Sequence, residues 1–338
     1  MTDFPFLPYG VMPGEFKKKG LDDQIVMVDW RPSLPQDERL KTFNTWKQDR
    51  LKEFGAHIWP QYDFKTRKFV GSARNFAKDL TFFEVGAMID AFMPPNNILE
   101  TKPTSPLAVT DIKMHLYHYE IEDQNPNPPG ASYRLYDRTL TIQEEETLVA
   151  VMIDAISNGD TIGKKAAGHF FFKDQMQRPR PLHAAMLAKR EASFVSELSE
   201  RGQHPSIVSG HCFQGVMMAC AVLEHWIATN PNLSQERIAS LAQYMVDVGD
   251  RRVFAGVHYP SDNIASWSLA MALIPEVFDD HETIVRFLRY AVMEKSTVFQ
   301  LIRDTFLDQS NLAFTEPSIK LLQRYDLDPS ATVPTSMA

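Results

Sequence analysis

Residues 209–230 read SGHCFQGVMMACAVLEHWIATN and form the longest apolar stretch with helical character in this chain of 338 residues. Its apolar run extends from Val216 to Leu223 and ends at Glu224. Ser209 suits the N-cap position. Gly215 and Ala219 are small enough to let a neighbouring helix approach closely. The stretch therefore predicts the longest apolar helix of the chain, with a neighbouring helix packed closely against it.

Apolar residues recur at helical spacing on both sides of this stretch, and strand patterns are weak throughout. The expected helices cover residues 36–55, 75–93, 108–121, 142–157, 160–176, 183–200, 234–249, 260–275 and 281–308, the last in two pieces. We predict an all-α fold of the helical-bundle type, with its core over residues 75–310. An irregular N-terminal arm with a packing helix is expected over 1–74, and a C-terminal helix with a frayed tail over 311–338.

The composition, 44% hydrophobic and 23% charged residues, is ordinary for a soluble globular protein. A net charge of −8, with Lys and Arg dispersed along the chain, argues against nucleic acid and anionic membrane surfaces as partners. The sequence has no apolar run of about 18 residues, so no membrane span is expected. We expect a small-molecule substrate and a homo-oligomer.

The cysteines and the N-terminus bear on the compartment. Cys212 and Cys220 are placed on one predicted helix, where they are too far apart to pair, which suits a reducing environment. The chain has no zinc-type Cys/His spacing, so no metal is expected. Its first residues lack the basic and apolar regions of a signal peptide. We expect a cytoplasmic protein, or a periplasmic or secreted one if a signal has been removed.

The helix start Ser209-Gly210-His211 has the features of an anion site. A helix N-terminus offers free backbone N–H groups and partial positive charge, and Gly210 leaves room for an anion to approach. His211 would project from the first turn beside that anion. Taken alone, the same residues also fit an ordinary cap followed by a surface histidine.

The stretch from Arg252 to Asp262 contains a second group of polar residues. His258 and Asp262 are four residues apart across a helix start at Pro260. A carboxylate at this spacing can bind one imidazole nitrogen and leave the other free as a nucleophile. A surface arginine and a capping aspartate are the plainer alternative.

The third group, Lys173, Arg180 and Pro181, offers two cations for phosphate oxygens. Arg178-Pro179 is an adjacent Arg-Pro pair, and spacing alone does not choose between the two. A solvated basic stretch is again the plainer alternative.

Together, the three groups resemble the signature of the type 2 phosphatidic acid phosphatase superfamily. That signature is Lys-x6-Arg-Pro, then Pro-Ser-Gly-His, then Ser-Arg-x5-His-x3-Asp. The matching residues are Lys173, Arg180, Pro181, Ser209, Gly210, His211, Arg252, His258 and Asp262. Val208 and Arg251 stand where the superfamily usually has Pro and Ser. The superfamily includes class A acid phosphatases, membrane lipid phosphatases and vanadium haloperoxidases, and the resemblance selects Arg180 over Arg178.

The resemblance implies a phosphatase that needs neither metal nor cofactor. His258 would attack phosphorus and form a phosphohistidine, with Asp262 orienting it, and His211 would act as general acid and then as general base. Fixed cations and backbone N–H groups would stabilise the charge of the transition state. The residues expected to hold phosphate or vanadate are Lys173, Arg180, Ser209, Gly210 and Arg252.

A vanadate-dependent haloperoxidase is the alternative activity. His204 lies five residues before Ser209, and the segment resembles the two-histidine segment of vanadium bromoperoxidases. The stretch from Gly256 to Asp262, in contrast, resembles the phosphatase branch. A non-catalytic anion-binding protein is the third possibility. The resemblance does not identify the substrate.

Overall fold

The computed structural model describes residues 35–59, 62–63, 68–69, 79–92, 140–156, 169–188, 190 and 205–331. These residues are helical apart from loops and two short strands, β1 (Tyr62–Asp63) and β2 (Lys68–Phe69), which pair antiparallel. The all-α prediction is confirmed. The expected arm before residue 35 and the expected helix 108–121 lie outside the described residues.

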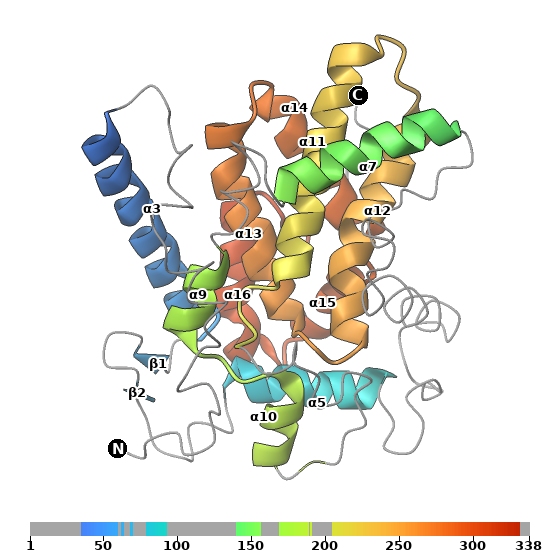
Figure 1. Ribbon diagram of the computed structural model, residues 1–338. Coiled ribbons are helices and arrows are strands. Elements are labelled where there is room, and N and C mark those ends of the chain that lie inside the picture. The colour runs from blue at the N-terminus through green and yellow to red at the C-terminus, as the bar shows by residue number, and fades with distance from the viewer. Residues whose placement is uncertain are drawn as a thin grey trace.

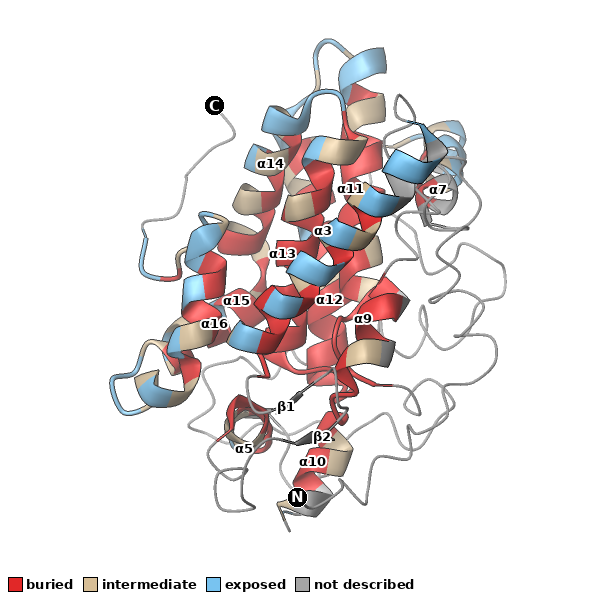
Figure 2. Cartoon of the chain, turned by 90° about the vertical axis from the view of Figure 1, so that its left-hand side faces the viewer, coloured by how far each residue is buried: buried red, intermediate tan, exposed pale blue. Residues whose placement is uncertain are grey.

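Three long helices form the centre of the molecule (Figure 1). They are α11 (Gly210–Thr229), α12 (Gln235–Phe254) and α13 (Pro260–Val277), and α11 contacts both of the others. Their apolar residues form the buried core (Figure 2). The apolar helix predicted from residues 209–230 is α11, which lies at this centre, and Ser209 is its N-cap, with its side chain accepting from the N–H of Cys212.

The remaining helices surround this centre. They are α3 (Gln36–His57), α5 (Leu80–Phe92), α7 (Ile142–Ile156), α9 (His169–Met176), α10 (Pro181–Leu187), α14 (His281–Tyr290), the π-helical turn η4 (Ala291–Lys295), α15 (Thr297–Phe306) and α16 (Leu312–Arg324). α7 packs on α11, α16 packs on α3 and α13, and α10 packs on α5. None of the helices in the described ranges is long and apolar enough to cross a bilayer.

Several helix ends differ from those expected. The described part of the helix expected over 183–200 is α10, which begins two residues earlier, at Pro181, because proline needs no hydrogen-bond partner at a first helical position. Residues 191–200 lie outside the described residues. α12 continues past residue 249 to Phe254, which places Arg252 in a helical turn. α5 begins at Leu80 rather than 75, and of the expected helix 160–176 the described part is α9.

The crossing of α11 and α12 depends on two glycines. A Cβ atom at Gly215 would lie 2.9 Å from Cβ of Val248, and one at Gly249 would lie 2.7 Å from Sγ of Cys212. Such distances are shorter than van der Waals contact, so a side chain at either position would push the two helices apart. The close approach expected at Gly215 is thus present, and it brings α12 against the first turns of α11.

We predict that Gly215→Ala lowers the free energy of unfolding by about 1–2 kcal/mol. The overpacking cost of about 1–3 kcal/mol exceeds the gain in helix propensity of about 1 kcal/mol. Urea denaturation checks this. Gly86→Ala in α5 is the matched control, because its new Cβ would meet only the flexible Arg190 guanidinium, at 3.3 Å. That variant should be as stable as the wild type or more stable; equal destabilisation of both variants would contradict the packing argument.

Candidate active site

The corner between α12 and α13 sets the position of His258. α12 ends in a Schellman motif, in which the N–H of Val257 donates to the carbonyl of Arg252 at 3.0 Å. Gly256 provides the left-handed residue that this motif needs, with φ of 73°. The N–H of His258 also donates to the Arg252 carbonyl, at 3.2 Å. Backbone hydrogen bonds therefore hold His258 against the end of α12.

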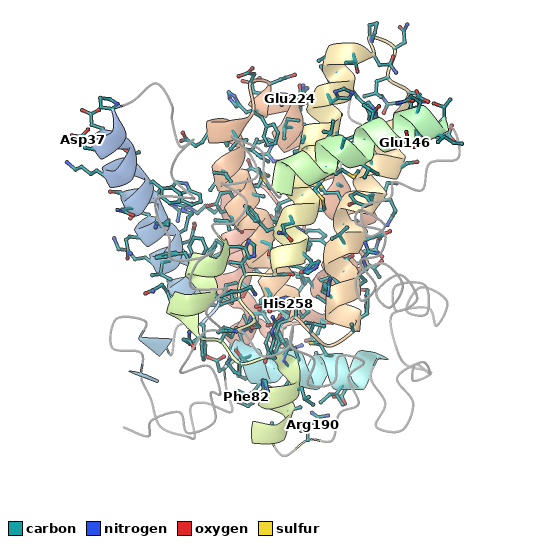
Figure 3. All side chains as sticks on the ribbon, in the orientation of Figure 1. Asp37, Phe82, Glu146, Arg190, Glu224 and His258 are labelled. Carbon is teal, nitrogen blue, oxygen red and sulfur yellow. The ribbon has the colours of Figure 1, made fainter. Side chains whose placement is uncertain are left out.

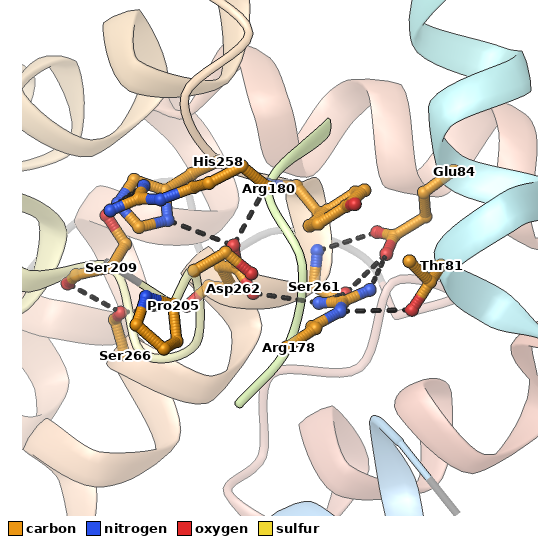
Figure 4. Close-up of polar contacts among 12 residues, drawn as sticks. Thr81, Glu84, Arg178, Arg180, Pro205, Ser209, His258, Ser261, Asp262 and Ser266 are labelled. Atoms are coloured by element: carbon orange, nitrogen blue, oxygen red, sulfur yellow. Dashed lines mark hydrogen bonds and ion pairs between the residues drawn. The ribbon is translucent and has the colours of Figure 1, made fainter. Parts of the chain in front are cut away.

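The start of α13 places a carboxylate beside this histidine. Pro260 is the first residue of the helix. Asp262 lies two residues further on, and its Oδ2 accepts from the N–H of Tyr259 at 3.1 Å. The same oxygen lies 2.9 Å from Nδ1 of His258. Asp262 thus caps the helix and contacts the imidazole with the same carboxylate oxygen (Figure 4).

The neighbours of His258 determine its tautomer. Nη1 of Arg180 lies 2.9 Å from Nε2 of His258 and also donates to the carbonyl of Val257 at 2.6 Å. Because a guanidinium can only donate, Nε2 must be the acceptor and carries no proton. The proton is then on Nδ1, where it is donated to Asp262. His258 therefore presents the lone pair of Nε2 towards the guanidinium of Arg180.

Arg178 makes different contacts from Arg180, although only one residue separates the two in the sequence. Its guanidinium is fully buried and forms ion pairs with Asp262 (Nη1 to Oδ1) and with Glu84 of α5 (Nη2 to Oε2), both at 2.8 Å. It also lies over the ring of Tyr259, 4.0 Å from the centroid. Motif spacing did not reveal these contacts, because Glu84 lies outside the three motifs and has no helical-periodicity signal of its own.

Lys173 connects α9 to the loop that precedes α11. It is buried, and Nζ donates to the carbonyls of Pro205 and Ser206, each at 3.0 Å. These bonds hold the segment that leads into Ser209 and the N-terminus of α11. Ser266 of α13 supports the same region, since its Oγ lies 3.0 Å from the carbonyl of Ser209.

The first turn of α11 carries Gly210 and His211. Gly210 is required there, because a Cβ would lie 2.8 Å from Nε2 of His169, a buried histidine of α9 that sequence reasoning did not single out. His211 is half-buried. His204, the second histidine of the haloperoxidase interpretation, lies outside the described residues.

Charges of the first and third motifs act together on His258. The pKa of His258 is lowered well below its usual value, first by burial and then by the charges of Arg180, Lys173 and Arg252. The pKa of Lys173 is itself lowered, by burial and by Arg180. The site lies at one end of the central helices, near α5 and α10 (Figure 3). Its buried cations outnumber its buried carboxylates, so the site is suited to an oxyanion.

We predict that His258 stays neutral when the free protein is titrated from pH 8 to pH 6. Burial and the nearby cations disfavour the imidazolium, whereas an unfolded histidine takes up a proton near pH 6.5. As the pH falls below about 6.5 this group therefore lowers the stability of the fold. Nitrogen-15 NMR, with His258→Gln to assign the signal, measures the titration. Protonation of His258 near pH 6.5 would contradict the prediction.

Comparison with known proteins agrees with the motifs. Residues 155–286 match the model of the PAP2 superfamily, and this range includes all three motifs. No curated protein and no solved structure matched the chain. The match, the helical fold and the ordered motifs agree with one another, and residues 155–286 form a region of the PAP2 superfamily type.

Proposed function

We propose that this protein is a phosphatase that hydrolyses phosphate monoesters through a phosphohistidine at His258, without a metal. One observation supports this most directly. His258 is held between Asp262 at Nδ1 and Arg180 at Nε2, each at 2.9 Å. This arrangement keeps the proton on Nδ1 and directs the lone pair of Nε2 towards Arg180, while burial and the nearby cations lower the pKa of the imidazole. The match to the PAP2 superfamily supports phosphoester hydrolysis in general.

In the first step the lone pair of Nε2 attacks phosphorus, and the P–O bond to the leaving alcohol breaks. The bound phosphate oxygens would take over the N–H of Arg180 that now contacts Nε2. The positive charge that forms on the imidazole is offset by Asp262, whose carboxylate accepts the Nδ1 proton in a hydrogen bond. His211, in its protonated form, donates a proton to the departing alkoxide.

In the second step a water molecule attacks the phosphohistidine. His211, now neutral, takes a proton from the water as its oxygen bonds to phosphorus. The N–P bond breaks, its electron pair returns to Nε2, and inorganic phosphate leaves. His211 is half-buried in the first turn of α11, a position that suits exchange of protons with the alcohol and with water.

In both steps the buried cations and the N-terminus of α11 would stabilise the negative charge of the transition state. Two N–H groups of Lys173 bind the carbonyls of residues 205 and 206, and we assign the third to a phosphate oxygen. Arg180, Arg252 and the backbone N–H groups at Ser209-Gly210 complete the donors. Fixed donors in a buried site are each worth about 3 kcal/mol to the transition state.

A vanadate-dependent haloperoxidase is the second candidate. The donors suited to phosphate also suit vanadate, which would be held by Lys173, Arg180 and Arg252 and would supply peroxide activation for halide oxidation. His204 in the sequence favours this branch, whereas the stretch from Gly256 to Asp262 favours a phosphatase. One preparation assayed for both activities decides between them.

We predict that His258→Ala lowers kcat for p-nitrophenyl phosphate at least about 10³-fold, because the nucleophile is removed. Absorbance of released p-nitrophenol measures this. His281→Gln is the control: His281 is an exposed histidine of α14, and its loss should leave kcat unchanged. Wild-type turnover by His258→Ala would exclude the phosphohistidine.

We further predict that hydrolysis persists in EDTA and is inhibited by orthovanadate, which resembles the transition state of phosphoryl transfer. The same preparation, given vanadate, hydrogen peroxide, bromide and a halogen acceptor, should not halogenate. Halogenation without hydrolysis would establish the second candidate instead. Absence of both activities across a broad panel of phosphate esters, with no binding of phosphate or vanadate, would overturn both.

A further inference from the structure

A buried cluster of charged residues lies on the far side of Asp262 from His258 (Figure 4). Arg178 is at its centre and pairs with Asp262 and Glu84, both at 2.8 Å. Its Nη1 also donates to Oγ of Ser261 at 2.8 Å, and its Nε donates to Oγ1 of Thr81 at 3.1 Å. All three nitrogens of the guanidinium therefore make contacts, and none of these contacts is to the imidazole of His258.

We propose that Arg178 and Glu84 are positioning residues, which hold the Asp262 carboxylate in the orientation and charge state that His258 requires. The proposal rests on the proposed function of His258 as nucleophile. Neither Arg178 nor Glu84 is expected to touch the substrate.

Asp262 depends on this cluster because it is completely buried. A buried carboxylate is stable only when it is paired and hydrogen-bonded. Oδ2 is already bound by His258 and by the N–H of Tyr259, at 2.9 Å and 3.1 Å. Arg178 binds the other oxygen, Oδ1, and thereby supplies the compensating charge and prevents rotation of the carboxylate. The direction of the hydrogen bond to Nδ1 of His258 is fixed as a result.

Glu84 in turn fixes Arg178. One of its oxygens accepts from the N–H of Ser261 at 2.7 Å, and the other accepts from Arg178 at 2.8 Å and contacts the Ser261 hydroxyl. Burial raises the pKa of Glu84 to about 7, against the opposing effect of the Arg178 charge. Glu84 and Asp262 bind different nitrogens of Arg178, Nη2 and Nη1, so the two carboxylates together fix the orientation of the guanidinium.

The two arginines of the first motif consequently have separate tasks. Arg180 contacts the nitrogen that is to attack, and Arg178 contacts the carboxylate behind it. Loss of Arg178 should therefore lower kcat and leave KM nearly unchanged, since an interaction made through Asp262 does not bind the ester. Loss of Arg180 should affect both.

The test compares Arg178→Gln, Arg178→Lys and Glu84→Gln. We expect Arg178→Gln to lower kcat by about 10–100-fold, as is typical for the loss of an outer hydrogen-bond partner, with KM changed by less than about threefold. Arg178→Lys should recover part of the loss because it restores the charge. Glu84→Gln should have the smallest effect. In an Asp262→Asn background, Arg178→Gln should lower kcat no further, because the residue through which it acts is already altered.

Arg190→Gln is the matched control. Arg190 forms an ion pair with Asp90 of α5 at 2.9 Å, close to Arg178 in sequence and to the same helix, but this pair is exposed and does not contact Asp262. Its loss should leave kcat unchanged. A purely structural role of Arg178 would lower the melting temperature and the amount of folded protein without this selective loss of kcat.

A second readout does not depend on activity. Because Arg180 keeps the proton on Nδ1 in every variant, the measurement is the proton NMR shift of this Nδ1–H: it should lie downfield in the wild type and in Arg190→Gln, where Asp262 accepts it, and less so in Arg178→Gln, where the carboxylate can rotate. If no ester is hydrolysed, the proposed function fails while this measurement still tests the positioning role. An unchanged shift of the Nδ1 proton together with unchanged kcat in the Arg178 variants would overturn the proposal. So would failure of all three variants to fold, which would assign the cluster to stability alone.

Discussion

The Asp262 carboxylate is the constraint on which the rest of the site depends. It is buried at the first turn of α13, and its two oxygens bind the imidazole of His258, the backbone of Tyr259 and the guanidinium of Arg178. Each of these partners offsets part of the cost of burying the negative charge of Asp262, and the partners hold one another in position. The same contacts cap a helix, set a tautomer and join α13 to α5 through Glu84. A change in any of these elements would therefore affect the position of His258 through the side chain of Asp262.

The packing of the helices brings the residues around Asp262 together from distant parts of the sequence. Glycines at 215 and 249 let α12 lie against α11, and the turn at Gly256 then reverses the chain so that α13 starts beside the end of α12. The N-terminus of α11 reaches the same region from the other side, where Ser266 of α13 contacts the carbonyl of Ser209. Packing of small residues, rather than polar attraction, therefore brings the polar groups together, and the buried charges are accommodated within a framework that apolar burial already stabilises.

Much of this arrangement could be predicted from the sequence, because its signals are local. A serine before a glycine and an apolar run indicates a helix start, and Pro260 indicates the next. The all-α fold and the helix beginning at Ser209 were predicted on that basis and are confirmed. Glu84 could not be predicted, since it lies 94 residues from Arg178 and in sequence resembles any polar residue of a helix. The continuation of α12 beyond Gly249 was missed for a related reason: the contact with Cys212 that makes a glycine favourable there is a tertiary one.

The charge balance explains how an acidic protein could attract and hold an anion. The chain has a net charge of −8, yet Lys173, Arg178, Arg180 and Arg252 are all buried near one end of the central helices. Burial of so much like charge is unfavourable in the free protein, and the lowered pKa of both Lys173 and His258 reflects it. A bound oxyanion would neutralise that excess and so favour the charged form of Lys173. Its binding would therefore be strengthened by relief of repulsion among the cations, in addition to the hydrogen bonds that they donate. The same repulsion favours the neutral form of His258 in the free protein, so in the proposed mechanism the charges that would bind the substrate would also prepare the group that attacks it.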